Sequence, residues 1–268
     1  NSRAGILRML GKMHDSPKGR ELFYGWLELA MIYYRWLEDM EMYWLSSLLL
    51  IIFGYLLGSI PTSYLVARWV KNIDLRRYGS GTVSGSMFYE HASRWMVVPV
   101  GLFDIFKGAF PTWLGLQLGL GDMIAVTAGM AAVVGHNWPL YLDFTGGRGL
   151  GTFSGVLLVI FPWGFVLLAA FLVLGFLLGD SAPWALAAIV LMPLLVFFLD
   201  GSGEAYWAIG AMLVLTVAKR LEANRRPLPV MRADRRRVLF LRVFFDRDIG
   251  SHKEWIRRTP ESDLSQSS

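Results

Sequence analysis

Residues 149–179 read GLGTFSGVLLVIFPWGFVLLAAFLVLGFLLG, a run of 31 residues without a charged side chain. As one helix this run would be about 46 Å long, whereas the hydrocarbon core of a bilayer is about 30 Å thick. Pro162-Trp163-Gly164 lies near the middle, and proline and glycine so placed favour a turn. The run therefore predicts two short membrane crossings joined by a tight turn.

The rest of the chain extends this pattern. Hydrophobic residues make up 54% of the sequence and charged residues only 18%, and the mean hydropathy is +0.44. A soluble domain usually carries charge on about a quarter of its residues. Further apolar runs occupy residues 44–67, 95–121, 123–135, 182–199 and 205–218. We therefore predict an all-α, polytopic integral membrane protein with seven transmembrane helices, the first of them kinked at Pro61.

Charge bias predicts the orientation of these helices. The segment 68–94 is basic, and residues 219–258 contain thirteen Lys or Arg against five Asp or Glu. Short basic segments beside membrane spans stay in the cytoplasm. The turns at Asp122 and at Asp200 and Glu204 are acidic and fit the outside. The expected topology has the N-terminus outside and the C-terminus in the cytoplasm.

The sequence divides into three parts: an amphipathic N-terminal extension (1–43), a seven-helix membrane domain (44–218) and a basic cytoplasmic tail (219–268). In the extension, residues 22–43 have the pattern of an amphipathic helix. This helix is expected on a membrane surface or against a partner, or alternatively packed on its own bundle. The two terminal parts are the expected contact regions for protein partners. Because the basic block directly follows the last apolar run, we expect no nucleic-acid partner.

The residue inventory excludes several kinds of chemistry. Cysteine is absent, which rules out disulfides, thiolate metal sites and a cysteine acyl-enzyme. The histidines lack the spacing that places two of them on one helical face. We expect neither a metal site nor a cofactor.

The sequences GHNWP at 135–139 and GGRG at 146–149 precede an apolar run. Glycines that lead into a helix N-terminus expose backbone N–H groups, and Arg148 adds a positive charge, so this segment predicts an anion cradle. In the alternative interpretation the glycines only permit close packing. A lone histidine such as His136 is more often structural than a base.

Asp104 and Lys107 stand three residues apart inside an apolar run, where ionisable groups are costly. They are expected to pair, either as a structural ion pair or with Lys107 as a phosphate ligand that Asp104 orients. A third segment, DLRRYGSGTVSGS at 74–86, alternates glycine with hydroxyl residues and can wrap a phosphate.

Taken in order, GSIP at 58–61, DLRRYGSG at 74–81, Asp104-x-x-Lys107-Gly108, GHNWP and GGRG resemble the bacterial acyl-phosphate:glycerol-3-phosphate acyltransferase family. The resemblance covers residues 48–225. It implies a multi-pass enzyme of the bacterial cytoplasmic membrane, which works among membrane lipids in phospholipid synthesis. It also implies transfer of an acyl group from acyl-phosphate to the 1-hydroxyl of glycerol-3-phosphate without a covalent acyl-enzyme.

The same comparison suggests roles for individual residues. The catalytic candidates are Ser80, Lys107 and His136. The candidates for binding substrate or phosphate are Gly79, Gly81, Asn137, Gly146, Gly147, Arg148 and Gly149, with Arg94 added as a replacement for the arginine that the family has at position 90.

Some positions depart from the family pattern. Glu90 stands where the family has an arginine, and Arg94 would neutralise Glu90 or replace that arginine if both lay on one helical face. The family's last motif has no clear counterpart in residues 218–225. An alternative interpretation is therefore a catalytically degenerate member that serves as a structural or lipid-binding subunit of a membrane complex. A weaker one is an anion transporter.

Overall fold

The computed structural model describes residues 17–258, and all of the regular secondary structure in this range is helical. The predicted all-α class is confirmed. The α-helices are α2 (Pro17–Ser59), α3 (Thr62–Lys71), α4 (Gly85–His91), α5 (Val97–Gln117), α6 (Asp122–Asn137), α7 (Leu150–Ile160), α8 (Pro162–Leu177), α9 (Ser181–Phe198), α10 (Gly203–Glu222), α11 (Arg232–Phe245) and α12 (His252–Ile256). Three short 3-10 helices are η1 (Leu75–Arg77), η2 (Leu140–Leu142) and η3 (Ala223–Arg225).

The chain divides into two compact units between Leu48 and Leu49. In the first unit, residues 17–48 are helical throughout, and α2 continues to Ser59 without a boundary near residue 44. Residues 38–48 contain neither glycine nor proline, so nothing in this stretch terminates the helix. Residues 1–16 of the predicted extension and 259–268 of the predicted tail lie outside the described range.

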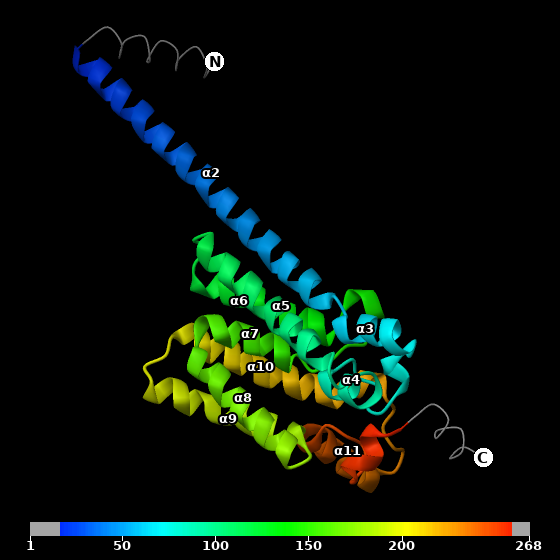
Figure 1. Cartoon of the computed structure of the whole chain (residues 1–268). Coiled ribbons are helices and arrows are strands. Elements are labelled where there is room, and N and C mark those ends of the chain that lie inside the picture. Colours follow the sequence, from blue (N-terminus) through cyan, green and yellow to red (C-terminus); the bar gives the residue numbers. More distant parts are fainter. Residues whose placement is uncertain (1–16, 259–268) are drawn as a thin grey trace. The chain divides into compact units, whose positions relative to one another are not determined.

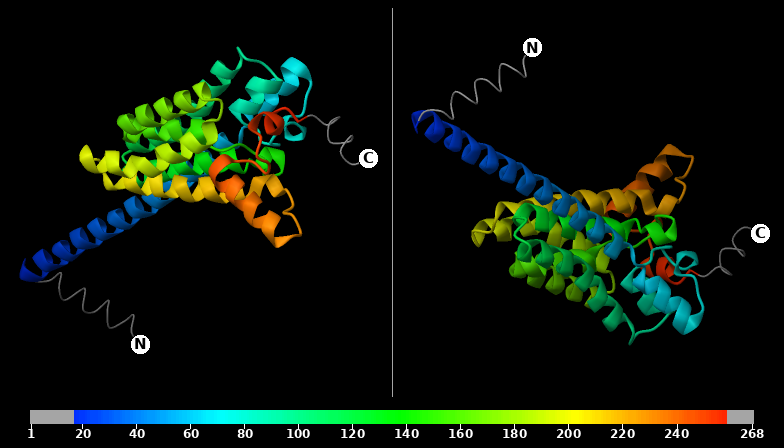
Figure 2. Two further views of the ribbon diagram at one scale, coloured as in Figure 1. Left: turned by 90° about the horizontal axis from the view of Figure 1, so that it is seen from below. Right: turned by 90° about the horizontal axis from the view of Figure 1, so that it is seen from above.

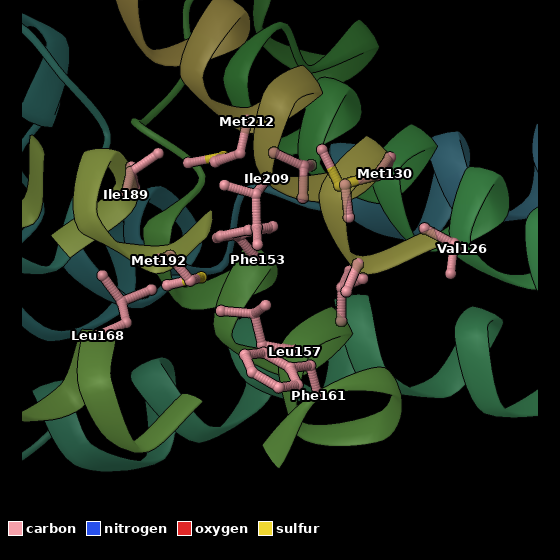
Figure 3. Close-up of a cluster of buried hydrophobic side chains, with 14 of the residues drawn as sticks. Val126, Met130, Phe153, Leu157, Phe161, Leu168, Ile189, Met192, Ile209 and Met212 are labelled. Carbon is pink, nitrogen blue, oxygen red and sulfur yellow. The ribbon is translucent and has the colours of Figure 1, made fainter. Parts of the chain in front are cut away.

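The second unit is a helical bundle in which α5 to α10 run side by side (Figures 1 and 2). Helix α7 contacts α5, α6, α8 and α10. The main core cluster lies between α6, α7, α8, α9 and α10 (Figure 3). Its labelled members are Val126, Met130, Phe153, Leu157, Phe161, Leu168, Ile189, Met192, Ile209 and Met212.

Prolines set two of the helix breaks. The turn expected at Pro162 is confirmed, because α7 ends at Ile160 and α8 begins at Pro162. Proline suits this first helical position since its missing N–H would have no partner there. The kink expected at Pro61 is instead a complete break: α2 ends at Ser59 and α3 begins at Thr62. The prediction of one helix over 44–67 was therefore wrong.

Glycines bring α5 and α7 into backbone contact. A β-carbon on Gly108 of α5 would overlap the carbonyl oxygen of Thr152 in α7. A β-carbon on Gly155 of α7 would overlap the carbonyl oxygen of Ile105 in α5. Small residues at such crossings let helices pack closely where lipid supplies no hydrophobic driving force.

The loops gather at two ends of the bundle. At one end, Arg247 of the C-terminal region pairs with Asp180 in the α8–α9 turn, and Asp246 pairs with Arg148 in the α6–α7 loop. At the other end, the α7–α8 break at Phe161 lies beside Gly201 in the α9–α10 turn. The basic C-terminal region therefore shares one end with the loops that carry the sequence motifs.

Three helical stretches are long and apolar enough to cross a membrane: the stretch within Arg20–Lys71, α5 and α9. Helices α7 and α8 are apolar but have only 11 and 16 residues. They reach about 16 and 24 Å, less than the hydrocarbon core.

The close crossing of α5 and α7 makes a prediction about stability. We expect Gly108→Ala to cost about 1–3 kcal/mol, because the added methyl group must push the α7 backbone away. At about 2–4 °C per kcal/mol, the thermal midpoint in detergent should fall by several degrees. Gly101→Ala in the same helix is the control, since a β-carbon there meets nothing within 4 Å. Equal midpoints for the two variants would contradict the crossing.

Candidate active site

A pocket opens where the break between α2 and α3 meets the end of α6 and the α6–α7 loop. Most of its lining comes from segments whose sequences resemble family motifs, although these segments are far apart in the chain. The lining residues are Gly58, Ile60, Pro61, Thr62, Ser63, Val83, His136, Pro139 and Gly146.

Lys107 is fully buried and is not among the residues that line this pocket, although its partner Ile60 is. Its Nζ donates to the carbonyl oxygen of Ile60 at 2.6 Å and to Oδ1 of Asp104 at 2.7 Å. The predicted pairing of Asp104 with Lys107 is confirmed. The same Asp104 oxygen lies 3.7 Å from Nδ1 of His136, so one carboxylate faces two of the three catalytic candidates, Lys107 and His136.

The GGRG loop lies directly on the end of α6. Gly147 N donates to the carbonyl oxygen of His136 at 3.1 Å. A β-carbon on Gly146 would overlap that carbonyl oxygen, and one on Gly147 would overlap the imidazole ring. Gly149 has φ of +71° and caps α7. The glycines here both permit close packing and lead into a helix N-terminus, so the two interpretations of this motif are compatible.

Asn137 is fully buried behind the loop. Neither polar atom of its side chain has a hydrogen-bond partner among residues 17–258. A buried amide without partners is costly, so this side chain is suited to bind a polar group.

Arg148 turns away from the pocket. Its Nε donates to Asp246 Oδ2 at 2.8 Å, its Nη2 lies 2.6 Å from Asp246 Oδ1, and its Nη1 donates to the carbonyl oxygen of Lys219 at 2.6 Å. The ion pair ties the GGRG loop to the C-terminal region. The predicted role of Arg148 in phosphate binding stays a prediction.

The first glycine-rich loop places Ser80 outside the pocket lining, whereas Val83 lies in it. Ser80 Oγ is 2.6 Å from Thr82 Oγ1, so its partner is a hydroxyl group and not an imidazole. Gly79 and Gly81 have φ of +49° and +67°, a conformation that favours glycine. Val83 N donates to the carbonyl oxygen of Gly146 at 3.3 Å, which joins this loop to the GGRG loop.

Asp74 fixes the start of this segment. Its carboxylate accepts from the backbone N–H of Arg76 and from the Arg76 guanidinium. The hydrogen bonds from Arg76 hold the pKa of Asp74 below its usual value. Asp74 therefore acts as a cap for η1 and remains ionised at neutral pH.

The condition under which Arg94 would neutralise Glu90 or replace the family's arginine, one shared helical face, is not met. Helix α4 ends at His91, so the two residues do not share a helical face. Glu90 pairs instead with Arg257 at 3.5 Å, and Arg94 lies over the ring of Tyr89 at 5.6 Å. The substrate-binding role of Arg94 stays a prediction, but the structure does not bring this residue into the pocket lining.

Two residues that sequence reasoning missed join the loops. Asn224 Nδ2 donates to the carbonyl oxygens of Gly81 at 2.8 Å and Gly146 at 3.4 Å. Arg226 Nη2 donates to the carbonyl oxygen of Gly79 at 2.9 Å. The signal for them is the Asn-Arg-Arg sequence just after the last apolar run, at the place where the family's last motif was expected.

The site supplies cationic and amide groups for an anionic ligand. Lys107 provides charge, and Asn137 provides unpaired hydrogen-bonding atoms close to the glycine loop. Within residues 17–258, no group of three or more His, Asp or Glu side chains is placed to hold a metal ion. The arrangement suits positioning of a phosphate ester next to a histidine.

Comparisons with known proteins agree on one family. The family model described as "Glycerol-3-phosphate acyltransferase" matches residues 48–228. Glycerol-3-phosphate acyltransferase 5 of Dehalococcoides mccartyi is 34% identical over 222 residues, covering 80% of this chain and 94% of the relative. The glycerol-3-phosphate acyltransferase of Synechococcus sp. (strain CC9902) is 37% identical over 181 residues, covering 67% and 90%.

A solved structure is also similar. It is the crystal structure of PlsY (YgiH), an integral membrane glycerol 3-phosphate acyltransferase, in its glycerol 3-phosphate form. The TM-score is 0.61 at 27% sequence identity, and the match covers 68% of this chain and 91% of that chain.

The pair of Arg148 and Asp246 makes a prediction about stability. Asp246→Asn should cost about 1–3 kcal/mol, because it weakens hydrogen bonds to a charged, largely buried guanidinium. The thermal midpoint in detergent should fall by several degrees. Asp143→Asn is the matched control, since the Asp143 side chain is 94% exposed and lies 4.0 Å from Arg76. An unchanged midpoint for Asp246→Asn would show that this pair does not hold the loop.

Proposed function

The chain belongs to the glycerol-3-phosphate acyltransferase family, and we propose that it transfers an acyl group from acyl-phosphate to the 1-hydroxyl of glycerol-3-phosphate in phospholipid synthesis. The family resemblance seen in the sequence is confirmed. The observation that supports this reaction best is the buried ion pair of Lys107 and Asp104. His136 faces the same Asp104 carboxylate, and the GGRG loop packs on His136.

The reaction needs few groups from the protein. The hydroxyl oxygen of the acceptor bonds to the acyl carbon, the bond from that carbon to the phosphate oxygen breaks, and phosphate leaves. Lys107 supplies positive charge for a phosphate group. His136, which faces the Asp104 carboxylate, is the candidate to accept the proton of the hydroxyl group. The Ser80 hydroxyl is hydrogen-bonded to the Thr82 hydroxyl and has no histidine partner within residues 17–258 to activate it, which fits a mechanism without a covalent acyl-serine.

The alternative of a catalytically degenerate subunit is not favoured. It relied on missing cations, namely the arginine replaced by Glu90 and the cations of the last motif, and on the added terminal segments. Glu90 pairs with Arg257, which offsets its charge, and Asn224 occupies the place of the missing motif between the two glycine-rich loops. The argument from missing cations is therefore weakened.

We also propose that the helices cross the bacterial cytoplasmic membrane seven times, with the N-terminus outside. The motif loops gather at the same end of the bundle as the basic C-terminal region, which supports a shared cytoplasmic face. The crossings would be α2, α5, α6, α7, α8, α9 and α10. Protein partners, if the chain has them, are expected to bind residues 1–43 or 219–268.

The topology is testable because the chain contains no cysteine. Asp122→Cys and Phe240→Cys should react with a membrane-impermeant thiol reagent from opposite sides of sealed vesicles. Reaction from the same side would contradict seven crossings. Labelling after detergent treatment is the control that both thiols are accessible.

The activity has a direct assay. Purified protein should release phosphate from acyl-phosphate only when glycerol-3-phosphate is present, and should form lysophosphatidic acid in equal amount. Phosphate release that is independent of glycerol-3-phosphate, or no release at all, would contradict the proposed function.

Lys107→Met tests the role of the buried cation. Loss of a hydrogen bond to a charged group costs about 1.5–3 kcal/mol, so affinity for glycerol-3-phosphate should fall at least about tenfold. Lys71→Met is the control, because it removes a lysine from the exposed end of α3. If Lys107→Met misfolds, Asp104→Asn/Lys107→Met also removes the carboxylate that was left unpaired. Unchanged affinity in a folded variant would assign Lys107 to a purely structural pair.

A further inference from the structure

The C-terminal segment, defined here as residues 251–258, lies beyond residue 228, where the match to the family model ends. It contains α12, drawn in red in Figures 1 and 2. The preceding residues anchor it to the bundle. Arg247 Nη1 donates to Asp180 Oδ2 at 2.5 Å, and Arg242 donates to Asp248 and to the carbonyl oxygen of Leu221.

Trp255 is the buried residue of this segment and is only 4% exposed. The guanidinium groups of Arg226 and Arg258 lie over its ring, at 4.5 and 4.8 Å from the centroid. Arg226 uses Nη2 to donate to the carbonyl oxygen of Gly79 at 2.9 Å. The indole ring therefore supports the side chain that holds Gly79.

Backbone groups of the segment contact the same region. Gly79 N donates to the carbonyl oxygen of Arg258 at 2.9 Å, and His91 Nε2 lies 2.6 Å from the carbonyl oxygen of Ile256. A β-carbon on Gly79 would lie 2.8 Å from the carbonyl oxygen of Ile256. Both backbone polar groups of Gly79 thus have their partners in residues 226–258.

We propose that Trp255 is a positioning residue for the acyltransferase reaction, and that it fixes the loop 79–81 through Arg226 and the backbone of the C-terminal segment. This proposal rests on the proposed function. The loop contains two glycines with positive φ, so holding it in one conformation costs backbone entropy. Contacts with the C-terminal segment order the loop when the protein folds, so this backbone entropy is not lost at the moment when substrate binds.

A single side chain connects the loop 79–81 to the GGRG loop. Asn224 donates to the carbonyl oxygens of both Gly81 and Gly146, so it ties the loop 79–81 to the GGRG loop. By family resemblance, the 135–149 loop, which contains GGRG, is expected to bind glycerol-3-phosphate. We therefore expect the acceptor KM to respond to loss of Trp255 more than the acyl-phosphate KM.

The test compares full-length variants reconstituted in the same lipid. In Trp255→Ala, kcat/KM for glycerol-3-phosphate should fall at least about tenfold, and the acceptor KM should rise. The reason is that even a small displacement of a substrate-binding group lowers the rate strongly. Amides of residues 76–88 should exchange with deuterium faster, while those of α5 and α7 should not change. Trp255→Phe should restore most of both properties, since it keeps an aromatic ring next to the two arginines.

Two further variants separate positioning from general stability. Lys253→Ala changes an exposed residue of α12 and should behave as wild type. His91→Leu removes the contact with Ile256 from the α4 side and should speed exchange even if Trp255→Ala does not fold. Loss of folded protein alone would lower the apparent kcat and leave both KM values unchanged.

The outcomes are distinct. Wild-type kcat/KM in folded Trp255→Ala would overturn the proposal, whether or not the amides exchange faster. A drop in kcat with unchanged KM and unchanged exchange at 76–88 would also overturn it. Absence of any transfer by the wild-type protein would count against the proposed function, and the exchange comparison would still decide whether the segment holds the loop.

Discussion

The contact of Lys107 with the carbonyl oxygen of Ile60 links the fold to the site. Pro61 ends the helical hydrogen bonding of α2, and the carbonyl group before it accepts from the ammonium at 2.6 Å. Asp104 supplies the balancing charge from the same helix as Lys107. A buried ammonium without these partners would cost several kcal/mol, so the break between α2 and α3 and the buried charge depend on each other.

Glycine determines how closely the other elements approach this charge. Gly108 follows Lys107 directly and meets the backbone of α7, whose N-terminus begins after the GGRG loop. Gly147 leaves room for the imidazole ring of His136. The motif glycines therefore serve packing and the candidate site together, because they let the helices cross closely and bring the loop backbone to His136.

Local signals in the sequence predicted much of this arrangement. Pro162 gave the break between α7 and α8, and the three-residue spacing gave the pair of Asp104 and Lys107. The tertiary contacts of Arg148 and Asn224 were not predictable in this way, because their partners lie 98 and 143 residues away. Helical periodicity relates only residues three or four positions apart. Helical periodicity also does not relate Arg94 to Glu90, because α4 ends before Arg94.

The basic C-terminal region shows why a count of charges is an incomplete description. Counting predicted a cytoplasmic tail, and it treated all of the arginines as equivalent. Yet Arg220, Arg242 and Arg247 are buried, and they bind carbonyl oxygens or carboxylates of the bundle. The exposed arginines at 235–237 of α11 remain available to bias orientation. One block of positive charge thus has two parts: in the proposed topology the exposed part favours the cytoplasmic side, and the buried part joins the C-terminal region to the loops of the site.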